Sequence, residues 1–173
     1  MIAFTSANAG AGVSHVVRKL AAQLAAQTRE PTAIVEAERL TTLQANDLVD
    51  LRGKCARTNV DQLWMLRKAT NGNGHQPLAP AASEMAGGFD GVQKLRSTFS
   101  HTLLDCPPIN ESHEAPLLAS HVDGVVLVVE ADQTKRDQIL RARQAIEMAG
   151  GTLMGMVLNK RRHLVPGWLY RML

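Results

Sequence analysis

Short apolar runs alternate with helix-length segments along this chain, and that alternation constrains the fold more than any other feature. Three of the short runs are Met1–Thr5, Thr32–Val35 and Thr102–Leu104. A fourth, Gly124–Glu130 (GVVLVVE), is apolar over almost its whole length, as expected of a strand buried on both faces. Strands that alternate with helices build βαβ units. The sequence therefore predicts an α/β fold, a three-layer sandwich with a mostly parallel central sheet.

Helical patterns occupy segments between these strands. The segment Ser14–Gln27 places four apolar residues on one face at helical spacing, namely Val17, Leu20, Ala21 and Leu24. The segment Lys135–Ala149 is also predicted to be helical, and it ends at Gly150 and Gly151, which suit a helix C-terminus. A last strand is predicted at Leu153–Leu158.

The middle of the chain carries weaker signals. Residues 41–70 are predicted to be helical in pieces, around Leu43, Leu48, Leu51, Leu63 and Leu66. Residues 71–88 contain the sequence NGNG, two prolines and many small residues, so they are predicted to form a flexible loop. Residues 89–98 follow as a short helix. The chain has 173 residues, and we expect it to form a single domain over 1–173.

The composition narrows the class of protein. Hydrophobic residues make up 45% of the chain and aromatic residues only 3%, so the core must be aliphatic. The formal net charge of +3 is too small to indicate nucleic-acid binding, and none is predicted. The histidines and cysteines show no metal-ligand spacing, and Cys106 is expected to be a buried thiol. No signal peptide or membrane-spanning apolar stretch is visible, so a cytoplasmic location is expected.

A glycine-rich turn, Ser6–Gly12, lies between the first predicted strand and the first predicted helix. This arrangement points backbone N–H groups and a helix N-terminus at an anion. The P-loop pattern is GxxxxGK[ST]. If Gly12 is its second glycine, Ala7 stands at the first glycine, Val13 at the lysine and Ser14 at the magnesium-binding hydroxyl. Taken alone, the loop is therefore an incomplete match, and a structural turn is the alternative interpretation.

Further segments follow the loop in a recognisable order. They are KLAAQLA at Lys19–Ala25, EAERL at Glu36–Leu40, DCPP at Asp105–Pro108, DGVVLVV at Asp123–Val129, Thr134, Gly155 and VLN at Val157–Asn159. Together with SANAGAGVSH at residues 6–15, this series resembles the cytoplasmic domain of the bacterial tyrosine kinases of polysaccharide export. That family is part of the MinD/ParA-like group of P-loop ATPases. The resemblance covers nearly the whole chain and implies a P-loop NTPase-like fold.

The resemblance also implies a set of site residues. Its nucleotide-binding positions correspond to Gly10, Ala11, Gly12, Val13, Ser14, His15 and Asn159. ATP or ADP with Mg²⁺ is the implied cofactor, with Ser14 and Asp105 at the metal. Glu36 and Glu38 stand where the family has catalytic aspartates. Asp105 is the acidic residue that matches the family pattern best. From the residues alone, Ser14 is equally explained as a helix N-cap, Asn159 as a turn residue, and the two glutamates as solvated charges.

Three departures from the family pattern bear on catalysis. Val13 offers neither the charge nor the hydrogen bond that the family lysine gives to phosphates, and Arg18 or Lys19 are poorly placed on the helix to replace it. Glu36 and Glu38 displace their carboxylates by one methylene. The family's tail has a tyrosine cluster, whereas this chain has one tyrosine, Tyr170.

Two functions follow as hypotheses. The first is a degenerate, catalytically impaired relative that acts as a regulatory or partner-binding component of exopolysaccharide or capsule biosynthesis. Its implied partner is the cytoplasmic face of a membrane polysaccharide chain-length or export protein, which would place it peripherally at the inner membrane, and a homo-oligomer is also allowed. The alternative is an active ATPase or tyrosine autokinase with an altered phosphate loop. A MinD/ParA-like positioning protein fits the DCPP and VLN segments less well.

Overall fold

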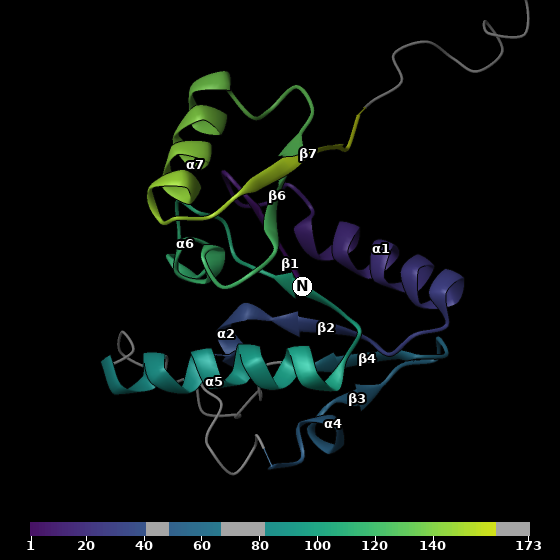
Figure 1. Cartoon of the computed structure of the whole chain (residues 1–173). Coiled ribbons are helices and arrows are strands. Elements are labelled where there is room, and N and C mark those ends of the chain that lie inside the picture. Colours follow the sequence, from purple (N-terminus) through teal and green to yellow (C-terminus); the bar gives the residue numbers. More distant parts are fainter. Residues whose placement is uncertain (41–48, 67–81, 162–173) are drawn as a thin grey trace, which may run out of the picture.

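The computed structural model describes residues 1–40, 49–66 and 82–161, and for residues 82–89 it describes the helical backbone alone (Figure 1). These residues form a seven-stranded sheet in the order β3-β4-β2-β5-β1-β6-β7. Its strands are β1 (Ile2–Ser6), β2 (Thr32–Glu36), β3 (Ala56–Arg57), β4 (Leu63–Leu66), β5 (His101–Asp105), β6 (Gly124–Glu130) and β7 (Leu153–Asn159). All neighbouring strands are parallel except β3 and β4, which confirms the predicted mostly parallel sheet.

Helices cover the two faces of this sheet (Figure 1). They are α1 (Val13–Thr28), α2 (Ala37–Leu40), α4 (Leu51–Lys54), α5 (Ala82–Thr98), α6 (Glu114–Ala119) and α7 (Arg136–Met148). One apolar cluster joins α1 to β1, β2, β5 and β6. A second cluster joins the opposite side chains of the same strands to α2, α4, α5, α6 and α7. The result is the predicted three-layer α/β sandwich.

The packing of α1 depends on small and β-branched residues spaced four apart. Its buried residues are Val13, Val17, Ala21 and Ala25, which occupy one stripe along the helix. Of the four residues predicted for this face, Val17 and Ala21 are fully buried, whereas the side chain of Leu20 is 40% exposed. The small alanines let the helix lie close to the strands, so the stripe is narrower than the sequence pattern indicated.

Two predictions for the middle of the chain are wrong. Leu63 and Leu66 belong to the strand β4, which pairs with β2, and not to a helix. A short apolar run such as LWML has no periodicity that distinguishes a strand from a buried helical turn. The predicted loop over residues 71–88 is helical from Ala82 onward. Four of the five residues at 82–86 are good helix formers, and they outweigh the two glycines that follow. Residues 71–81 lie outside the described part of the chain.

Other expectations agree with the structure where it describes them. Leu51 begins the short helix α4, while Leu43 and Leu48 lie outside the described residues. Cys106 is 2% exposed, and burial raises the pKa of its thiol, as expected of an inert internal cysteine. Among the described residues, no helix combines the length and apolarity needed to cross a bilayer.

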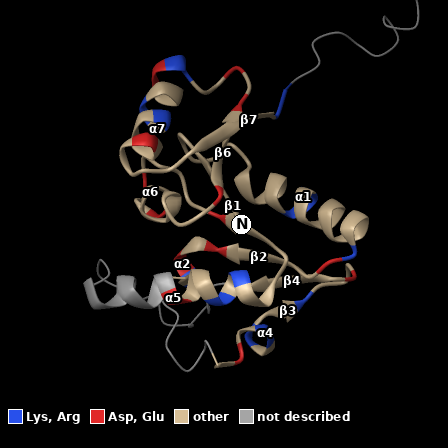
Figure 2. Cartoon of the chain, viewed as in Figure 1, with Lys and Arg blue, Asp and Glu red and all other residues tan. Residues whose placement is uncertain are grey.

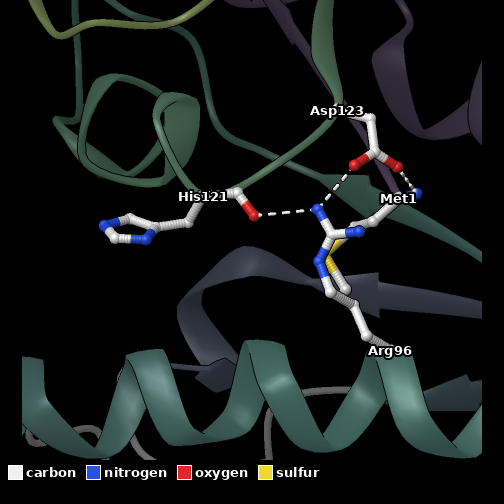
Figure 3. A network of polar contacts seen from close by, with 4 residues as sticks. All are labelled: Met1, Arg96, His121 and Asp123. Carbon is white, nitrogen blue, oxygen red and sulfur yellow. Dashed lines mark hydrogen bonds and ion pairs between the residues drawn. The ribbon is translucent and has the colours of Figure 1, made fainter.

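A polar network holds α5 against the N-terminal edge of the sheet (Figure 3). The Asp123 carboxylate accepts a hydrogen bond from Arg96 Nη2 at 2.6 Å and another from the Met1 amine at 2.5 Å. The same Arg96 nitrogen donates to the His121 carbonyl at 3.2 Å. The Arg96 guanidinium and the Met1 amine lower the pKa of Asp123. This network lies at the end of the sheet opposite to the glycine loop.

Candidate nucleotide-binding site

The candidate site lies where the parallel strands end. The chain leaves β1, which lies between β5 and β6, at Ser6 and enters α1 at Val13, so the glycine loop lies at the carboxyl end of β1. Because β2, β5, β6 and β7 run parallel to β1, their last residues reach the same edge. These residues are Glu36, Asp105, Glu130 and Asn159. Ligands in open α/β sheets bind at this carboxyl edge of the strands.

Two glycines give the loop its shape. Gly10 has a φ of 85° and Gly12 a φ of 86°, both in the left-handed region that side chains disfavour. Gly12 is also the N-cap of α1. A Cβ atom added at Gly12 would lie 2.5 Å from Asn159 Nδ2, so the Asn159 side chain would have to shift and its hydrogen bond to Ala11 would be disturbed. The loop is therefore fixed against β7, with the N-terminus of α1 directed at the cleft.

A cleft of about 470 Å³ opens on the side of the loop that faces β5 and β2. Its lining includes Ser6, residues 9–14, residues 36–38, residues 105–108 and Glu111. Four of these residues are acidic, namely Glu36, Glu38, Asp105 and Glu111, and we call them the acidic flank. No lysine or arginine is among the described residues that line the cleft. The acidic segment where β2 meets α2 is red in Figure 2.

The DCPP segment is held directly against β1. The Cys106 N–H donates to the Phe4 carbonyl at 2.9 Å, and the Thr5 hydroxyl donates to the Pro107 carbonyl at 2.7 Å. The pairing of β5 with β2 places Asp105 beside Glu36, its register partner on β2. The motif therefore has a structural role as well as a chemical one, because it fixes a carboxylate at the mouth of the cleft.

The protonation of the Asp105 carboxyl group is perturbed by its surroundings. Burial raises the pKa of Asp105, and the nearby Glu36 carboxylate acts in the same direction. A hydrogen bond with the Ser14 side chain and the charge of Arg18 oppose that rise. A hydroxyl beside a carboxylate is a suitable pair of oxygen donors for Mg²⁺, which binds few protein groups and completes its shell with phosphate and water. Both residues therefore fit the predicted metal position.

Val13 is the first residue of α1, as its place in the glycine pattern predicted. Its side chain touches the cleft but is only 9% exposed. It packs in the apolar cluster that contains Phe4, Val17 and Val128. The position that carries a lysine in a complete P-loop is thus part of the hydrophobic core, and it contributes no charge to the cleft.

The opposite side of the loop is made by β6 and β7. Asn159 Nδ2 donates to the Ala11 carbonyl at 2.8 Å, and Lys160 Nζ forms an ion pair with Glu130 Oε1 at 3.2 Å. We call Glu130, Asn159 and Lys160 the β7 flank. Asn159 therefore supports the loop through its side-chain nitrogen. A second cavity of about 270 Å³ lies here, lined by residues that include Asn8, Ala11, Glu130 and Thr134.

The structure brings most of the predicted residues together. Glu36, Glu38, Asp105 and residues 10–14 all line the cleft, and Asn159 contacts the loop from behind. His15 is the exception, because its side chain is exposed and does not line the cleft. Within the described ranges, no three His, Cys, Asp or Glu residues form a group that could hold a metal ion by themselves. A ligand role for each residue stays a prediction.

Sequence reasoning missed Glu111, Glu130 and Lys160. Glu130 ends the predicted strand 124–130, so its position at the carboxyl edge could have been inferred from the parallel sheet. Lys160 follows the last predicted strand in the same way. Glu111 lies in the connection after DCPP, and its approach to the cleft depends on how that connection folds. Nothing in the local pattern indicates it.

The parallel sheet, the glycine loop after β1 and the Ser14–Asp105 pair define an α/β domain of the P-loop NTPase type. No protein-family model matches the chain. It is 27% identical over 177 aligned residues to the tyrosine-protein kinase CpsD of Streptococcus agalactiae, an alignment that covers 92% of this chain and 75% of the relative. The resemblance to the bacterial tyrosine kinases that the motifs implied is therefore confirmed.

Solved structures agree on the fold. The kinase domain of the Escherichia coli tyrosine kinase ETK superposes with a TM-score of 0.70 at 17% identity, covering 96% of this chain and 70% of that one. MinD from Pyrococcus horikoshii, solved with Mg-ADP, has a TM-score of 0.63 at 14% identity, covering 99% of this chain and 75% of that one. At these identities the likeness establishes the P-loop NTPase fold, which both proteins share with this chain.

Proposed function

We propose that this chain is a catalytically impaired relative of the tyrosine kinases of capsule and exopolysaccharide biosynthesis, acting as a regulatory or partner-binding component. The similarity to CpsD supports the biological setting. The observation that supports impaired catalysis is the burial of Val13 in the apolar cluster, at the position of the phosphate-binding lysine. A charge-assisted hydrogen bond to phosphate contributes about 1.5–3 kcal/mol, and valine contributes none.

The acidic flank supports the same proposal. Phosphoryl transfer depends on positive groups that neutralise charge developing on the phosphate oxygens. Here the cleft presents the carboxylates of Glu36, Glu38, Asp105 and Glu111, with no lysine or arginine among its described lining residues. Glu36 and Glu38 also carry one methylene more than the aspartates at the family's positions. Their carboxylates are therefore expected to miss the placement that the reaction requires.

Nucleotide binding without efficient transfer is compatible with the site. The Ser14 hydroxyl and Asp105 would hold Mg²⁺, while the backbone N–H groups of Gly10 to Val13 would face a phosphate at the start of α1. The bound metal would screen the phosphate charge from the surrounding carboxylates. The chain's own residues would thus bind and orient a nucleotide, and the bound form would present a defined surface to a partner.

The proposed partner is the cytoplasmic face of a membrane protein that controls polysaccharide chain length or export. This assignment rests on the resemblance to CpsD. The tail after Lys160 contains Trp168, Leu169, Met172 and Leu173 beside basic residues at 160–162, a composition that suits docking on such a partner or on the membrane surface. Assembly of several copies remains a further prediction.

The deciding experiment measures phosphoryl transfer directly. The purified chain is incubated with γ-labelled ATP and Mg²⁺, and incorporation of label is followed beside the Streptococcus agalactiae CpsD kinase as a positive control. We expect no incorporation at Tyr170, the only tyrosine of the chain, and ATP hydrolysis at the level of an Asp105→Ala variant. Labelling of Tyr170 would establish an active kinase, and hydrolysis that Asp105→Ala abolishes would establish an active ATPase; either result would overturn the impaired function.

One observation favours the active alternative. The Ser14 side chain keeps its hydrogen bond to Asp105, and both face the cleft as the family pattern requires. A metal-dependent reaction could use this pair if another cation replaced the missing lysine. The same experiment separates the two functions, because only an active form labels Tyr170 or hydrolyses ATP faster than the Asp105→Ala variant in the presence of Mg²⁺.

A further inference from the structure

We propose that Lys160, on the β7 flank, is the cation that contacts the phosphate of a nucleotide bound on the glycine loop. It supplies the positive charge that Val13 lacks. The inference rests on the proposed nucleotide-binding site. Lys160 follows β7 directly and has a φ of 56°, an unusual left-handed conformation for a residue with a side chain. Such outliers persist where the surrounding structure fixes them, and they are common at binding sites.

The side chain of Lys160 runs alongside the loop. Its Cε lies 4.0 Å from the position that a Cβ atom would take at Gly12, the residue that caps α1. Its Nζ is bonded to Glu130 Oε1, and Glu130 Oε2 lies 3.9 Å from the corresponding position at Gly10. The ion pair therefore spans both glycines of the loop. A rotation about the last bonds of the lysine moves Nζ without any change in the backbone.

Other basic residues near the loop are less suitable. Arg18 lies one turn into α1 and acts on Asp105 by charge; like Lys160, it is not among the described residues that line the cleft. Lys19 is exposed on the same helix. Of these three residues, Lys160 is the one with a side-chain atom within 4.0 Å of the Cβ position at Gly12, the glycine next to Val13.

Glu130 gives the lysine a partner when no anion is bound. Its side chain is 23% exposed and that of Lys160 is 48% exposed, so the pair is partly screened by water. A phosphate with two negative charges offers Lys160 a stronger partner than one carboxylate. Binding would thus exchange a lysine–glutamate pair for a lysine–phosphate pair, and Glu130 would weaken binding by competing for the lysine.

The test measures ADP binding in the presence of Mg²⁺ by calorimetry for the full chain and its variants. Lys160→Ala is expected to weaken binding roughly tenfold to a hundredfold, while Lys160→Arg retains most of the affinity. Glu130→Gln is expected to tighten binding several-fold. The matched control is Lys94→Ala, which removes one positive charge from α5, and it is expected to leave the affinity unchanged.

Adenosine serves as the second probe because it has no phosphate. The proposal requires that Lys160→Ala lose ADP affinity while its thermal midpoint and its adenosine affinity stay at the wild-type values. An equal loss for both ligands would show a merely structural role and would overturn the proposal. Unchanged ADP affinity in Lys160→Ala, a larger loss in Arg18→Ala, or no ADP binding by the wild type would overturn it as well. None of these outcomes alters the labelling result that tests the impaired function.

Discussion

The two flanks of the glycine loop differ in charge and in how tightly they hold the loop. On the acidic flank, four carboxylates face an open cleft of about 470 Å³ and no described lysine or arginine joins them. On the β7 flank, Asn159 is bonded to the loop and Lys160 is paired with Glu130. The loop's support and a lysine side chain that lies beside Gly12 thus come from the same side.

This difference shows that two features of a P-loop can be separated. The backbone shape of the loop depends on Gly10, Gly12 and their contact with Asn159, all of which are in place. The charge of the loop depends on the residue at position 13, which has joined the hydrophobic core. A chain can therefore keep the fold that presents a phosphate-binding loop while losing the group that makes the loop efficient in phosphoryl transfer.

The largest effect is expected for Gly12→Ala, which breaks the contact between the loop and the β7 flank. An alanine at this position would place its methyl group 2.5 Å from Asn159 Nδ2, and its backbone would have to keep a φ of 86°. Steric overlap and left-handed strain together are expected to destabilise the fold by about 2–3 kcal/mol. Chemical denaturation measures this change in the free energy of unfolding.

The control for that variant is Gly155→Ala on β7, because no atom lies within 4 Å of the added methyl group. It is expected to change stability by less than about 0.5 kcal/mol. In an Asn159→Ala background, Gly12→Ala should lose part of its cost, since the overlap is relieved and the backbone strain remains. Equal costs in both backgrounds would show that the β7 flank does not constrain the loop.

The second prediction restores a charge on the acidic flank. Val13→Lys is expected to tighten Mg-ATP binding by roughly ten- to a hundredfold, the equivalent of one charge-assisted hydrogen bond. The aliphatic part of the lysine can occupy the volume of the valine side chain. Its amine can then reach the cleft, which Val13 already touches. Calorimetry with Mg-ATP measures the gain.

Val13→Met separates charge from size in that experiment, because it lengthens the side chain without an amine. It should leave the affinity near that of the wild type. If Val13→Lys gave no gain while the protein stayed folded by circular dichroism, the acidic flank would lack more than a cation. The comparison between the flanks would then have to include the placement of Glu36 and Glu38.

The third prediction concerns the pH dependence of Asp105. Burial raises the pKa of this carboxyl group in the folded state, so stability falls as the pH rises from the ordinary aspartate pKa of about 3.9 to the raised folded pKa, and the full cost is present above it. Asp105→Asn is therefore expected to raise the thermal midpoint at pH 7. The gain should disappear below about pH 3, where the carboxyl group is protonated in both folded and unfolded states.

Thermal unfolding of both proteins between pH 3 and pH 8 measures the difference. The asparagine retains a side-chain oxygen that can accept the Ser14 hydrogen bond, so the substitution tests charge and not the bond. Glu111→Gln, which removes a carboxylate from the same flank, is the comparison variant. A stabilisation by Asp105→Asn that persists at pH 3 would contradict the electrostatic origin.

Much of the fold could be predicted because its signals are local and strong. The run Gly124–Glu130 was predicted with the bounds that β6 has, since a continuous apolar run of this length fits a strand covered on both faces. The strand β4 was missed because LWML has no period, and its structure is decided by pairing with β2. The start of α5 at Ala82 was missed because neighbouring glycines and prolines obscured a helix-forming stretch.

The candidate site could be predicted only where a motif orders its residues along the chain. The glycine pattern placed Val13 and Ser14 at the start of α1, and DCPP placed Asp105 at the end of β5. Lys160 lies 148 positions after Gly12 and reaches it because β7 and β6 extend the sheet beyond β1. Such a contact depends on the order of strands, which a single sequence does not specify.

The smallest effect is expected at the far edge of the sheet, where the Arg96–Asp123 pair serves as a reference for both flanks (Figure 3). Arg96→Ala should cost less than about 1 kcal/mol of stability at pH 7, because both side chains are partly exposed. Arg96 lowers the pKa of Asp123, so this contribution is present above the ordinary aspartate pKa of about 3.9 and is lost as the pH falls through the lower folded value. Denaturation at pH 7 and pH 2.5 measures both limits, with Arg143→Ala on α7 as an exposed-pair control.

Because the network is remote from the glycine loop, the ADP affinity of Arg96→Ala should stay at the wild-type value. A loss of ADP affinity would mean that charge changes anywhere on the molecule affect binding. The contrast between the two flanks would then not be local.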